Sequence, residues 1–300
     1  MCGVVGIIGK KNASSLVLEG LKKLEYRGYD SAGIASFYQK SIQVAKSEGK
    51  LVNLINKVND LAKDNLYYET SIALGHTRWA THGNINIKNA HPLTSENRVA
   101  VVHNGIIENY ASIKKTLESE GYVFTSQTDT EVLPHLFNKY LKKGHDFLQA
   151  GRLVLKDIKG AFAFVAICLD FPDQLFVSRN SSPLAIGLGE GSNFVGSDAQ
   201  SINHLTNKII YLEDGDYALI KVNNIEIFDN ESNKVDRKII NVQSELGLIT
   251  KGGYKHFMEK EIYEQPSVIP HTISSFINPK STIDIDLDKL GFSQKSSLII

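Results

Sequence analysis

The chain has 300 residues, 42% hydrophobic and 22% charged, which suits one large globular domain or a domain with an additional piece. Its 33 basic and 33 acidic residues give a formal net charge of zero, so we expect neither nucleic acid nor an anionic membrane as a partner. Two cysteines make no disulfide framework, and the N-terminal segment looks like neither a signal peptide nor a membrane span, so we expect a reducing, cytoplasmic compartment.

The first nine residues, Met-Cys-Gly-Val-Val-Gly-Ile-Ile-Gly, place a cysteine behind the initiator methionine and ahead of a β-branched run typical of a buried strand. If Met1 is removed, Cys2 carries a thiol and an α-amine on one Cα. Because a free cysteine titrates near ~8.5 and an α-amine near ~7.7–8.0, the amine can accept the thiol proton. Position alone leaves two interpretations open: Cys2 is a nucleophile, or it is only a small residue after methionine.

Helical and strand patterns follow. The stretch Glu-Tyr-Arg-Gly-Tyr-Asp-Ser-Ala-Gly at 25–33 is rich in turn formers and fits a structural loop at least as well as a catalytic one. The expected elements are a helix over 14–24 capped by Ser14 or Ser15, a hairpin over 33–37 and 42–45, an amphipathic helix over 50–62 and a strand over 71–74.

That last strand runs into Gly-His-Thr-Arg-Trp-Ala-Thr-His-Gly at 75–83. Here Arg78 is suited to bind a substrate carboxylate through its planar fork. Histidines at 76, 82, 91 and 103 raise the alternative of a metal site. Without a nearby second cysteine or the paired spacings of a zinc site, we expect no metal, and we interpret most of these histidines as hydrogen-bonded structure.

A strand over 98–102 delivers His-Asn-Gly-Ile at 103–106 ahead of a helix over 108–120. Such an Asn-Gly can present a side-chain amide and a backbone N–H to one point, as an oxyanion hole requires. Alone, Asn-Gly more commonly marks a turn. Asp129 precedes a helix over 131–141, capped by Thr128 or Thr130, where it is either a carboxylate favoured by the helix N-terminus or a partner for an ammonium group.

The second half is predicted to be all-β, and the first domain to be an α+β layered domain ending near residue 241. Residues 251–266 suggest a flexible break and a charged connection, and a helix begins at 270–276. The last residues are apolar, so we expect a further domain beyond them. The predicted strands cover 161–170, 174–179, 184–188, 193–196, 209–212, 217–222 and 225–228.

Taken in order, five motifs resemble those of the class II glutamine amidotransferases, and the ordered set is far more specific than any one motif. They are Met-Cys-Gly-Val-Val-Gly at 1–6, Tyr-Arg-Gly-Tyr-Asp-Ser-Ala-Gly at 26–33, His-Thr-Arg-Trp-Ala-Thr-His-Gly at 76–83, His-Asn-Gly-Ile-Ile-Glu-Asn at 103–109 and Thr-Asp-Thr-Glu at 128–131.

Within that family, Lys-His-Phe-Met-Glu-Lys-Glu-Ile-Tyr-Glu-Gln-Pro at 255–266 looks like the connector of the amino-sugar-forming branch. The resemblance covers essentially the whole chain and implies an N-terminal-nucleophile hydrolase fold, a four-layer αββα sandwich. It implies a glutaminase domain over 1–241, a linker over 242–266 and the start of a truncated sugar-isomerase domain over 267–300.

The resemblance also implies roles. Cys2 would attack the side-chain amide of L-glutamine with its own α-amine as base, while Asn104 and the Gly105 N–H hold the oxyanion. Arg78 would bind the α-carboxylate and Asp129 the α-ammonium group of glutamine.

Three more residues complete the implied pocket. Thr81 and His82 would line it, and Trp79 would lie in a loop that closes over bound glutamine. No cofactor is implied. Ser181, in Arg-Asn-Ser-Ser-Pro-Leu at 179–184, departs from related sequences, which often have Gly before Ser-Pro, and this difference is expected to alter only a turn.

In the complete family enzyme, ammonia passes to the missing domain, which converts fructose 6-phosphate to glucosamine 6-phosphate. The homodimer of that enzyme relies largely on the same domain. Three alternatives stay open: a sister amidotransferase acting on phosphoribosyl diphosphate or forming asparagine, a catalytically silent glutamine-binding module, and a peptidase or acylase of the same fold. The connector at 255–266 disfavours a sister amidotransferase. The presence of Cys2, Arg78, Asn104 and Asp129 disfavours a silent binding module, and an arginine and an aspartate suited to a free amino acid disfavour a peptidase or acylase.

Overall fold

The computed structural model describes residues 2–9, 12–38, 40–62, 70–79, 84–242 and 253–276. It divides into two units, Met1–Ser244 and Glu245–Ile300, which are described separately. Among the described residues, no helix is both long enough and apolar enough to span a membrane.

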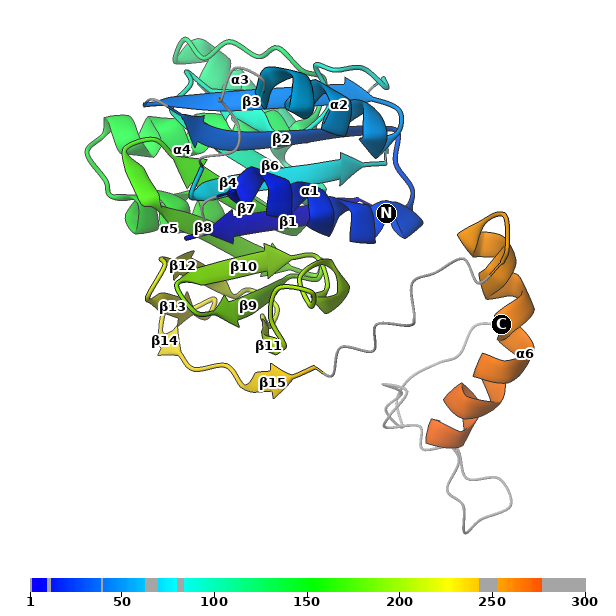
Figure 1. The fold of residues 1–300 in the computed structure, drawn as a ribbon. Coiled ribbons are helices and arrows are strands. Elements are labelled where there is room, and N and C mark those ends of the chain that lie inside the picture. Colours follow the sequence, from blue (N-terminus) through cyan, green and yellow to red (C-terminus); the bar gives the residue numbers. More distant parts are fainter. Residues whose placement is uncertain are drawn as a thin grey trace, which may run out of the picture. The chain divides into compact units, whose positions relative to one another are not determined.

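Two antiparallel sheets face each other in the first unit (Figure 1). One has the strand order β15-β11-β9-β10-β1-β4-β2-β3, and the other has the order β14-β13-β12-β8-β7-β6-β5. The strands are β1 Gly3–Ile8, β2 Ser31–Tyr38, β3 Ser41–Glu48, β4 Ile72–Arg78, β5 Leu93–Ser95, β6 Val99–Ile107, β7 Gly160–Cys168, β8 Phe171–Asn180, β9 Ala185–Gly189, β10 Ser192–Gly196, β11 Lys208–Tyr211, β12 Tyr217–Ile220, β13 Ile225–Phe228, β14 Lys234–Val235 and β15 Ile239–Asn241.

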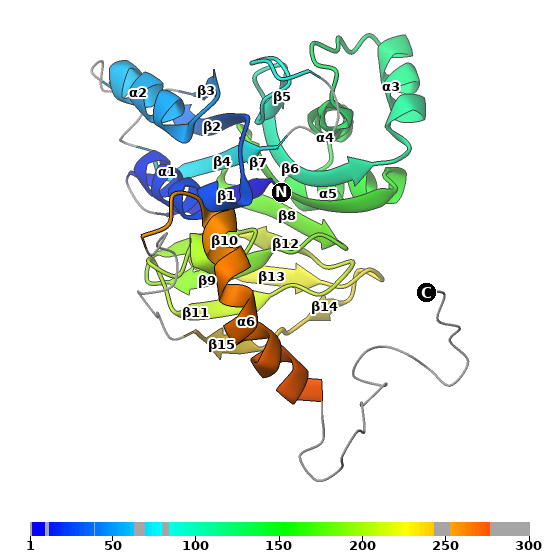
Figure 2. The same ribbon diagram turned by 90° about the vertical axis from the view of Figure 1, so that its right-hand side faces the viewer.

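Helices cover the outer face of each sheet (Figure 2). On the β1 sheet lie α1 (Ala13–Leu24) and α2 (Leu51–Ala62). On the β7 sheet lie α3 (Tyr110–Ser119), α4 (Val132–Lys142) and α5 (Phe147–Asp157). The order helix, sheet, sheet, helix confirms the predicted four-layer αββα sandwich.

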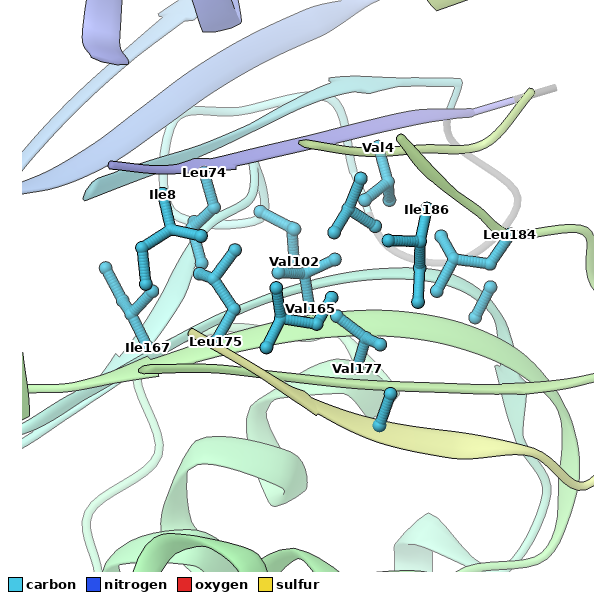
Figure 3. Packing of buried hydrophobic residues seen from close by; sticks show 14 of the residues in the cluster. Val4, Ile8, Leu74, Val102, Val165, Ile167, Leu175, Val177, Leu184 and Ile186 are labelled. Carbon is cyan, nitrogen blue, oxygen red and sulfur yellow. The ribbon is translucent and has the colours of Figure 1, made fainter. Parts of the chain in front are cut away.

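The period-two alternation of the strands builds the core between the sheets. On β1, Val4 and Ile8 point to the inner layer, whereas Val5 and Ile7 pack against the helices outside. Figure 3 shows this inner layer, where Val4 and Ile8 meet Val165 and Leu175 and their neighbours from the opposite sheet.

Several elements differ from the sequence-based predictions. The strand predicted for 71–74 extends as β4 to Arg78, and the one predicted for 98–102 extends as β6 to Ile107, so His-Thr-Arg and His-Asn-Gly lie within the strands rather than directly after them. Helix α1 has Asn12 at its N-cap, with φ of 73°, and Ser14 instead bonds Thr70.

No helix was expected over 147–157, where α5 lies, with Asp146 capping it through Gln149 N. Gly151 at its centre weakens helix propensity. A Cβ at this position would lie 2.1 Å from Cε2 of Phe176, so the glycine lets α5 approach the sheet closely. Packing therefore overrides propensity here.

The second unit contains α6 (Phe257–Phe276), whose start is supported by Lys255 N donating to Glu259 Oε2. The prediction that a helix begins only at residue 270 is therefore wrong, because most of the expected connection is already helical. The apolar residues 296–300 lie outside the described part of the chain.

The residue that departs from related sequences occupies a strained position. Ser181 has φ of 63°, in the left-handed region that costs an L-residue about 1–2 kcal/mol and glycine much less. We expect Ser181→Gly to raise the free energy of unfolding by about 0.5–1 kcal/mol, because glycine's greater unfolded-state entropy offsets part of the gain. Urea unfolding measures this. Ser182→Gly is the matched control, and equal effects of the two substitutions would contradict the prediction.

Candidate active site

Strands from both sheets bring polar residues to one end of the inner layer. On β4, Ile72 and Leu74 belong to that layer, so the next alternate residues, His76 and Arg78, face the same side. Cys2 precedes β1 and lies beside Trp79, which directly follows β4. These strand ends therefore change from apolar core to polar site within two or three residues.

The opposite sheet contributes through β6. Ala100 and Val102 face the inner layer, and Asn104 is the next residue on that face. Gly105 has φ of 119°, and a Cβ there would lie 2.0 Å from the Ala161 carbonyl oxygen, so only glycine fits. This close pairing with β7 exposes the Gly105 backbone toward the site.

A small pocket that opens to solvent lies at these strand ends. Its lining combines a thiol, a guanidinium, a carboxylate, imidazoles and hydroxyls. The described residues that line it are Cys2, Arg78, Trp79, His91, His103, Gly105, Thr128, Asp129 and Thr130.

The Cys2 thiol is held against the backbone of Trp79. Trp79 N donates to Cys2 Sγ at 3.2 Å, and Sγ lies 3.5 Å from the Trp79 carbonyl oxygen. Burial raises the pKa of Cys2, and the Trp79 N–H opposes that shift only in part. The thiol therefore rests protonated near neutral pH and needs a base before it can attack a carbonyl carbon.

Trp79 also depends on a nearby glycine. A Cβ at Gly28, where φ is 90°, would lie 2.3 Å from the indole ring of Trp79. The indole is half exposed over this glycine, while the Trp79 backbone contacts the thiol. Trp79 therefore contributes both an exposed indole ring and a backbone contact to the Cys2 thiol at the pocket mouth.

Asn104 lies directly beneath Cys2. Its Nδ2 lies 3.0 Å from Ser197 Oγ and 3.3 Å from the Cys2 carbonyl oxygen, and its Oδ1 lies 2.9 Å from His76 Nε2. One amide hydrogen is committed to Ser197, and the other makes the longer contact to Cys2. That second hydrogen is available to an oxyanion formed next to Cys2.

A cation and an anion lie in the same pocket. Arg78 is buried, with Nη1 4.0 Å from Asp30 Oδ1, and Asp129 is buried with Oδ2 accepting from Ile107 N at 2.7 Å. Since Arg78 suits a carboxylate and Asp129 an ammonium group, the pair is complementary to the α-substituents of a free amino acid.

Three imidazoles lie side by side at the pocket, and two of them, His91 and His103, line it. The ring centroids of His76 and His91 are 4.3 Å apart, and those of His91 and His103 are 6.4 Å apart. Burial lowers the pKa of His76 to about 3, lowers that of His91 well below its ordinary value and lowers that of His103. All three are therefore neutral at physiological pH.

These histidines should make the fold sensitive to acid. Their folded-state pKa values lie below the unfolded value of ~6.5, so the unfolded chain binds more protons as the pH falls through that window. Stability is full above ~6.5, and at pH 5 His76 alone should cost about 2 kcal/mol. Urea unfolding measured above pH ~6.5 and at pH 5 gives this loss.

Substitution of one of these histidines tests whether they cause the loss of stability at acid pH. His103→Gln should reduce the pH dependence, whereas His145→Gln, which removes an exposed histidine, should leave it unchanged. An identical loss of stability in wild type and His103→Gln would contradict this assignment.

Five sequence-predicted residues line the pocket together: Cys2, Arg78, Trp79, Gly105 and Asp129. Asn104 is not a lining residue but contacts the Cys2 backbone from below. Thr81 and His82 lie outside the described residues. Among the described residues, no group of three His, Cys, Asp or Glu side chains is placed to hold a metal ion.

Sequence reasoning missed the supporting residues. Arg27 donates to the Cys2 carbonyl oxygen at 3.5 Å and pairs with Asp198, which also accepts from the Tyr26 hydroxyl. Arg27 lies in a stretch that fitted a structural loop at least as well as a catalytic one. The signal for its position was the Tyr-Arg-Gly motif, but Asp198 lies 171 residues away and has no local signature.

Comparison with known proteins agrees with this geometry. A family model described as a glutamine amidotransferase domain matches residues 76–204. The chain is 45% identical over 288 residues to a protein of Mesorhizobium japonicum named glutamine–fructose-6-phosphate aminotransferase (isomerizing), covering 96% of this chain and 46% of the relative. The protein of the same name in Acinetobacter baylyi is 47% identical over 278 residues, covering 93% and 44%.

Solved structures show the same fold. Glutamine phosphoribosylpyrophosphate amidotransferase from B. subtilis superposes with a TM-score of 0.64 at 26% identity, covering 78% of this chain and 50% of that one. A structure titled as the allosteric regulatory enzyme of purine biosynthesis gives 0.65 at 28%, covering 77% and 50%. The chain thus spans about half the length of the curated relatives it matches.

Proposed function

Because this chain belongs to the class II glutamine amidotransferases, we propose that it hydrolyses L-glutamine to glutamate and ammonia through a thioester on Cys2. The observation that carries the proposal is the meeting of a thiol, a carboxylate-binding guanidinium and an ammonium-binding carboxylate in one pocket. A free α-amino acid whose side chain ends in an amide fits that set.

The chemistry needs Cys2 as the first residue. With Met1 removed, the Cys2 α-amine takes the thiol proton, and the thiolate attacks the side-chain carbonyl carbon of glutamine. The oxyanion accepts hydrogen bonds from Asn104 Nδ2 and Gly105 N, and the C–N bond breaks as the leaving nitrogen takes the proton held by the Cys2 α-ammonium group and departs as ammonia. Water then cleaves the thioester, releasing glutamate and restoring the thiol.

Arg78 and Asp129 would orient the substrate rather than move protons. The Arg78 guanidinium would bind the α-carboxylate, and Asp129 the α-ammonium group. Trp79, whose backbone contacts the thiol, would lie in the loop that closes over the bound substrate, and Thr81 and His82 would line the same pocket.

We extend the proposal to a longer protein, since the chain spans about half of relatives named for glutamine and fructose 6-phosphate. There, residues 1–241 form the glutaminase domain, 242–266 a linker and 267–300 the start of a sugar-isomerase domain. The ammonia is used to convert fructose 6-phosphate to glucosamine 6-phosphate in a cytoplasmic homodimer. The relatives' name supports this destination, and two free cysteines support a reducing compartment.

The test is glutamate release from glutamine by the purified chain, with an intact mass that shows Met1 to be absent. We expect release from L-glutamine, because binding through Arg78 and Asp129 requires both α-substituents. A glutamine analogue lacking the α-carboxylate should react poorly. No release from chains that lack Met1 would contradict the proposal.

The substrate clamp makes a separate prediction. Arg78→Lys keeps the charge beside Asp30 but loses the planar fork, so the KM for glutamine should rise roughly 10-fold with little change in kcat. Arg98→Lys is the control, because Arg98 pairs with Asp170 away from the pocket. An unchanged KM in Arg78→Lys would remove Arg78 from substrate binding.

A further inference from the structure

The amide of Asn104 can adopt only one orientation between its neighbours. A backbone carbonyl oxygen only accepts hydrogen bonds, so the NH2 group must face Cys2, at 3.3 Å. Oδ1 then faces His76 Nε2 at 2.9 Å. Since Oδ1 only accepts, Nε2 must carry the proton and donate it.

Ser197 supports the same orientation from the other side. Its hydroxyl oxygen accepts from Val4 N at 2.7 Å and lies 3.0 Å from Asn104 Nδ2. Val4 N is part of β1, directly after the Cys2–Gly3 peptide, so Ser197 links the amide to the strand that carries the nucleophile. Three contacts therefore hold Asn104, but only the one from His76 reaches its oxygen.

The surroundings of His76 keep its imidazole neutral and fix its orientation. It is fully buried on β4, between Val4 of β1 and Gly33 of β2 in the paired register. Its Nδ1 has no hydrogen-bond partner among the described residues, so a second proton would be unsatisfied. Burial, with smaller contributions from His103 and Arg78, disfavours a positive charge on His76 and lowers its pKa.

We propose that His76 is a positioning residue, whose Nε2–H orients and polarises the Asn104 amide so that Nδ2 stabilises the oxyanion formed at Cys2. A hydrogen bond to the amide oxygen strengthens the amide N–H as a donor. The inference rests on the proposed glutaminase function and deepens it, because it assigns the support of the oxyanion hole to a residue outside the pocket lining.

Two nearly isosteric substitutions separate the donor from the bulk of the side chain. His76→Gln keeps an N–H that can reach Oδ1, whereas His76→Met fills similar space without a donor. We expect His76→Met to lower kcat for glutamine hydrolysis about 10- to 100-fold with an almost unchanged KM, as for other residues that orient reacting groups. His76→Gln should recover most of that loss.

A double-mutant cycle shows whether His76 acts through Asn104. Asn104→Ala should lower kcat about 10²- to 10³-fold, as for the loss of an oxyanion-hole donor. If the inference holds, adding His76→Met to Asn104→Ala lowers kcat no further. Multiplicative losses, or equal losses in His76→Met and His76→Gln, would overturn it.

His135→Gln is the matched control, since His135 is also buried, lies on α4 and bonds Ser95 Oγ at 2.8 Å outside the pocket. Its kcat should stay close to that of wild type. If the His76 variants do not fold, ¹⁵N NMR of the wild-type imidazoles decides the matter. The Nε2–H tautomer of His76 supports the inference, and an Nδ1–H tautomer overturns it.

The outcomes also separate this inference from the proposed function. Wild type that lacks Met1 and releases no glutamate would overturn both. Cys2-dependent release combined with a multiplicative cycle would overturn only the role of His76.

Discussion

Cys2→Ala is expected to abolish glutamate release. Among the described residues that line the pocket, the Cys2 thiol is the only group that can form a thioester, and removing the nucleophile of a hydrolase can cost on the order of 10⁶-fold in kcat. The fold should persist, because the substitution removes only the sulfur atom at the pocket mouth. Steady-state glutamate release, measured beside a urea unfolding curve, checks both statements.

Cys168→Ala provides the control for that experiment. Cys168 is a fully buried core residue on β7, and burial raises the pKa of its thiol to about 11. Its loss should leave kcat close to that of wild type while lowering stability slightly. Activity retained by Cys2→Ala, or lost from a folded Cys168→Ala, would contradict the assignment of the nucleophile.

Gly105→Ala is the second substitution with a large expected effect. The new Cβ would lie 2.0 Å from the Ala161 carbonyl oxygen, and φ of 119° is strained for any other residue. Backbone strain of about 1–3 kcal/mol and overpacking of about 1–3 kcal/mol should both lower stability. Since β6 must move, the Gly105 N–H leaves its position and kcat should fall at least about 10²-fold.

Gly144→Ala separates these two costs. Gly144 has φ of 89°, but no heavy atom of the described residues lies within 4 Å of the Cβ position. This variant should show only the backbone strain and full activity. Similar stability and kcat in the two variants would mean that the approach of β6 to β7 does not shape the site.

Apolar periodicity was enough to predict most central strands. Gly3–Ile8 and Ile225–Phe228 were expected with the bounds the structure gives, because apolar or β-branched runs between turn formers leave little ambiguity. The ends of β4 and β6 were not predicted, since His-Thr-Arg and His-Asn-Gly contain polar groups and turn formers. Only the three-dimensional structure shows that His76, Arg78 and His103 are buried and that His76 pairs with Asn104 of the opposite sheet.

The arrangement of the site depended on long-range contacts. Cys2, Arg78 and Asp129 could be named from motifs, but nothing local indicates that Ser197 would contact Asn104, 93 residues away. His76 belongs to a group of histidines most of which were interpreted as hydrogen-bonded structure, and its partner Asn104 lies on the opposite sheet, where no local pattern indicates it. Motifs thus indicate which groups act, whereas sheet packing determines which groups hold them.

Covalent labelling tests the central claim most directly. A glutamine analogue with an electrophilic carbon at the position of the side-chain carbonyl should bind through Arg78 and Asp129 and alkylate the Cys2 thiol in chains that lack Met1. Peptide mass analysis should find one label, on Cys2, and excess glutamate should protect against it. Labelling at Cys168, or labelling unaffected by glutamate, would contradict a glutaminase site built around the N-terminal cysteine.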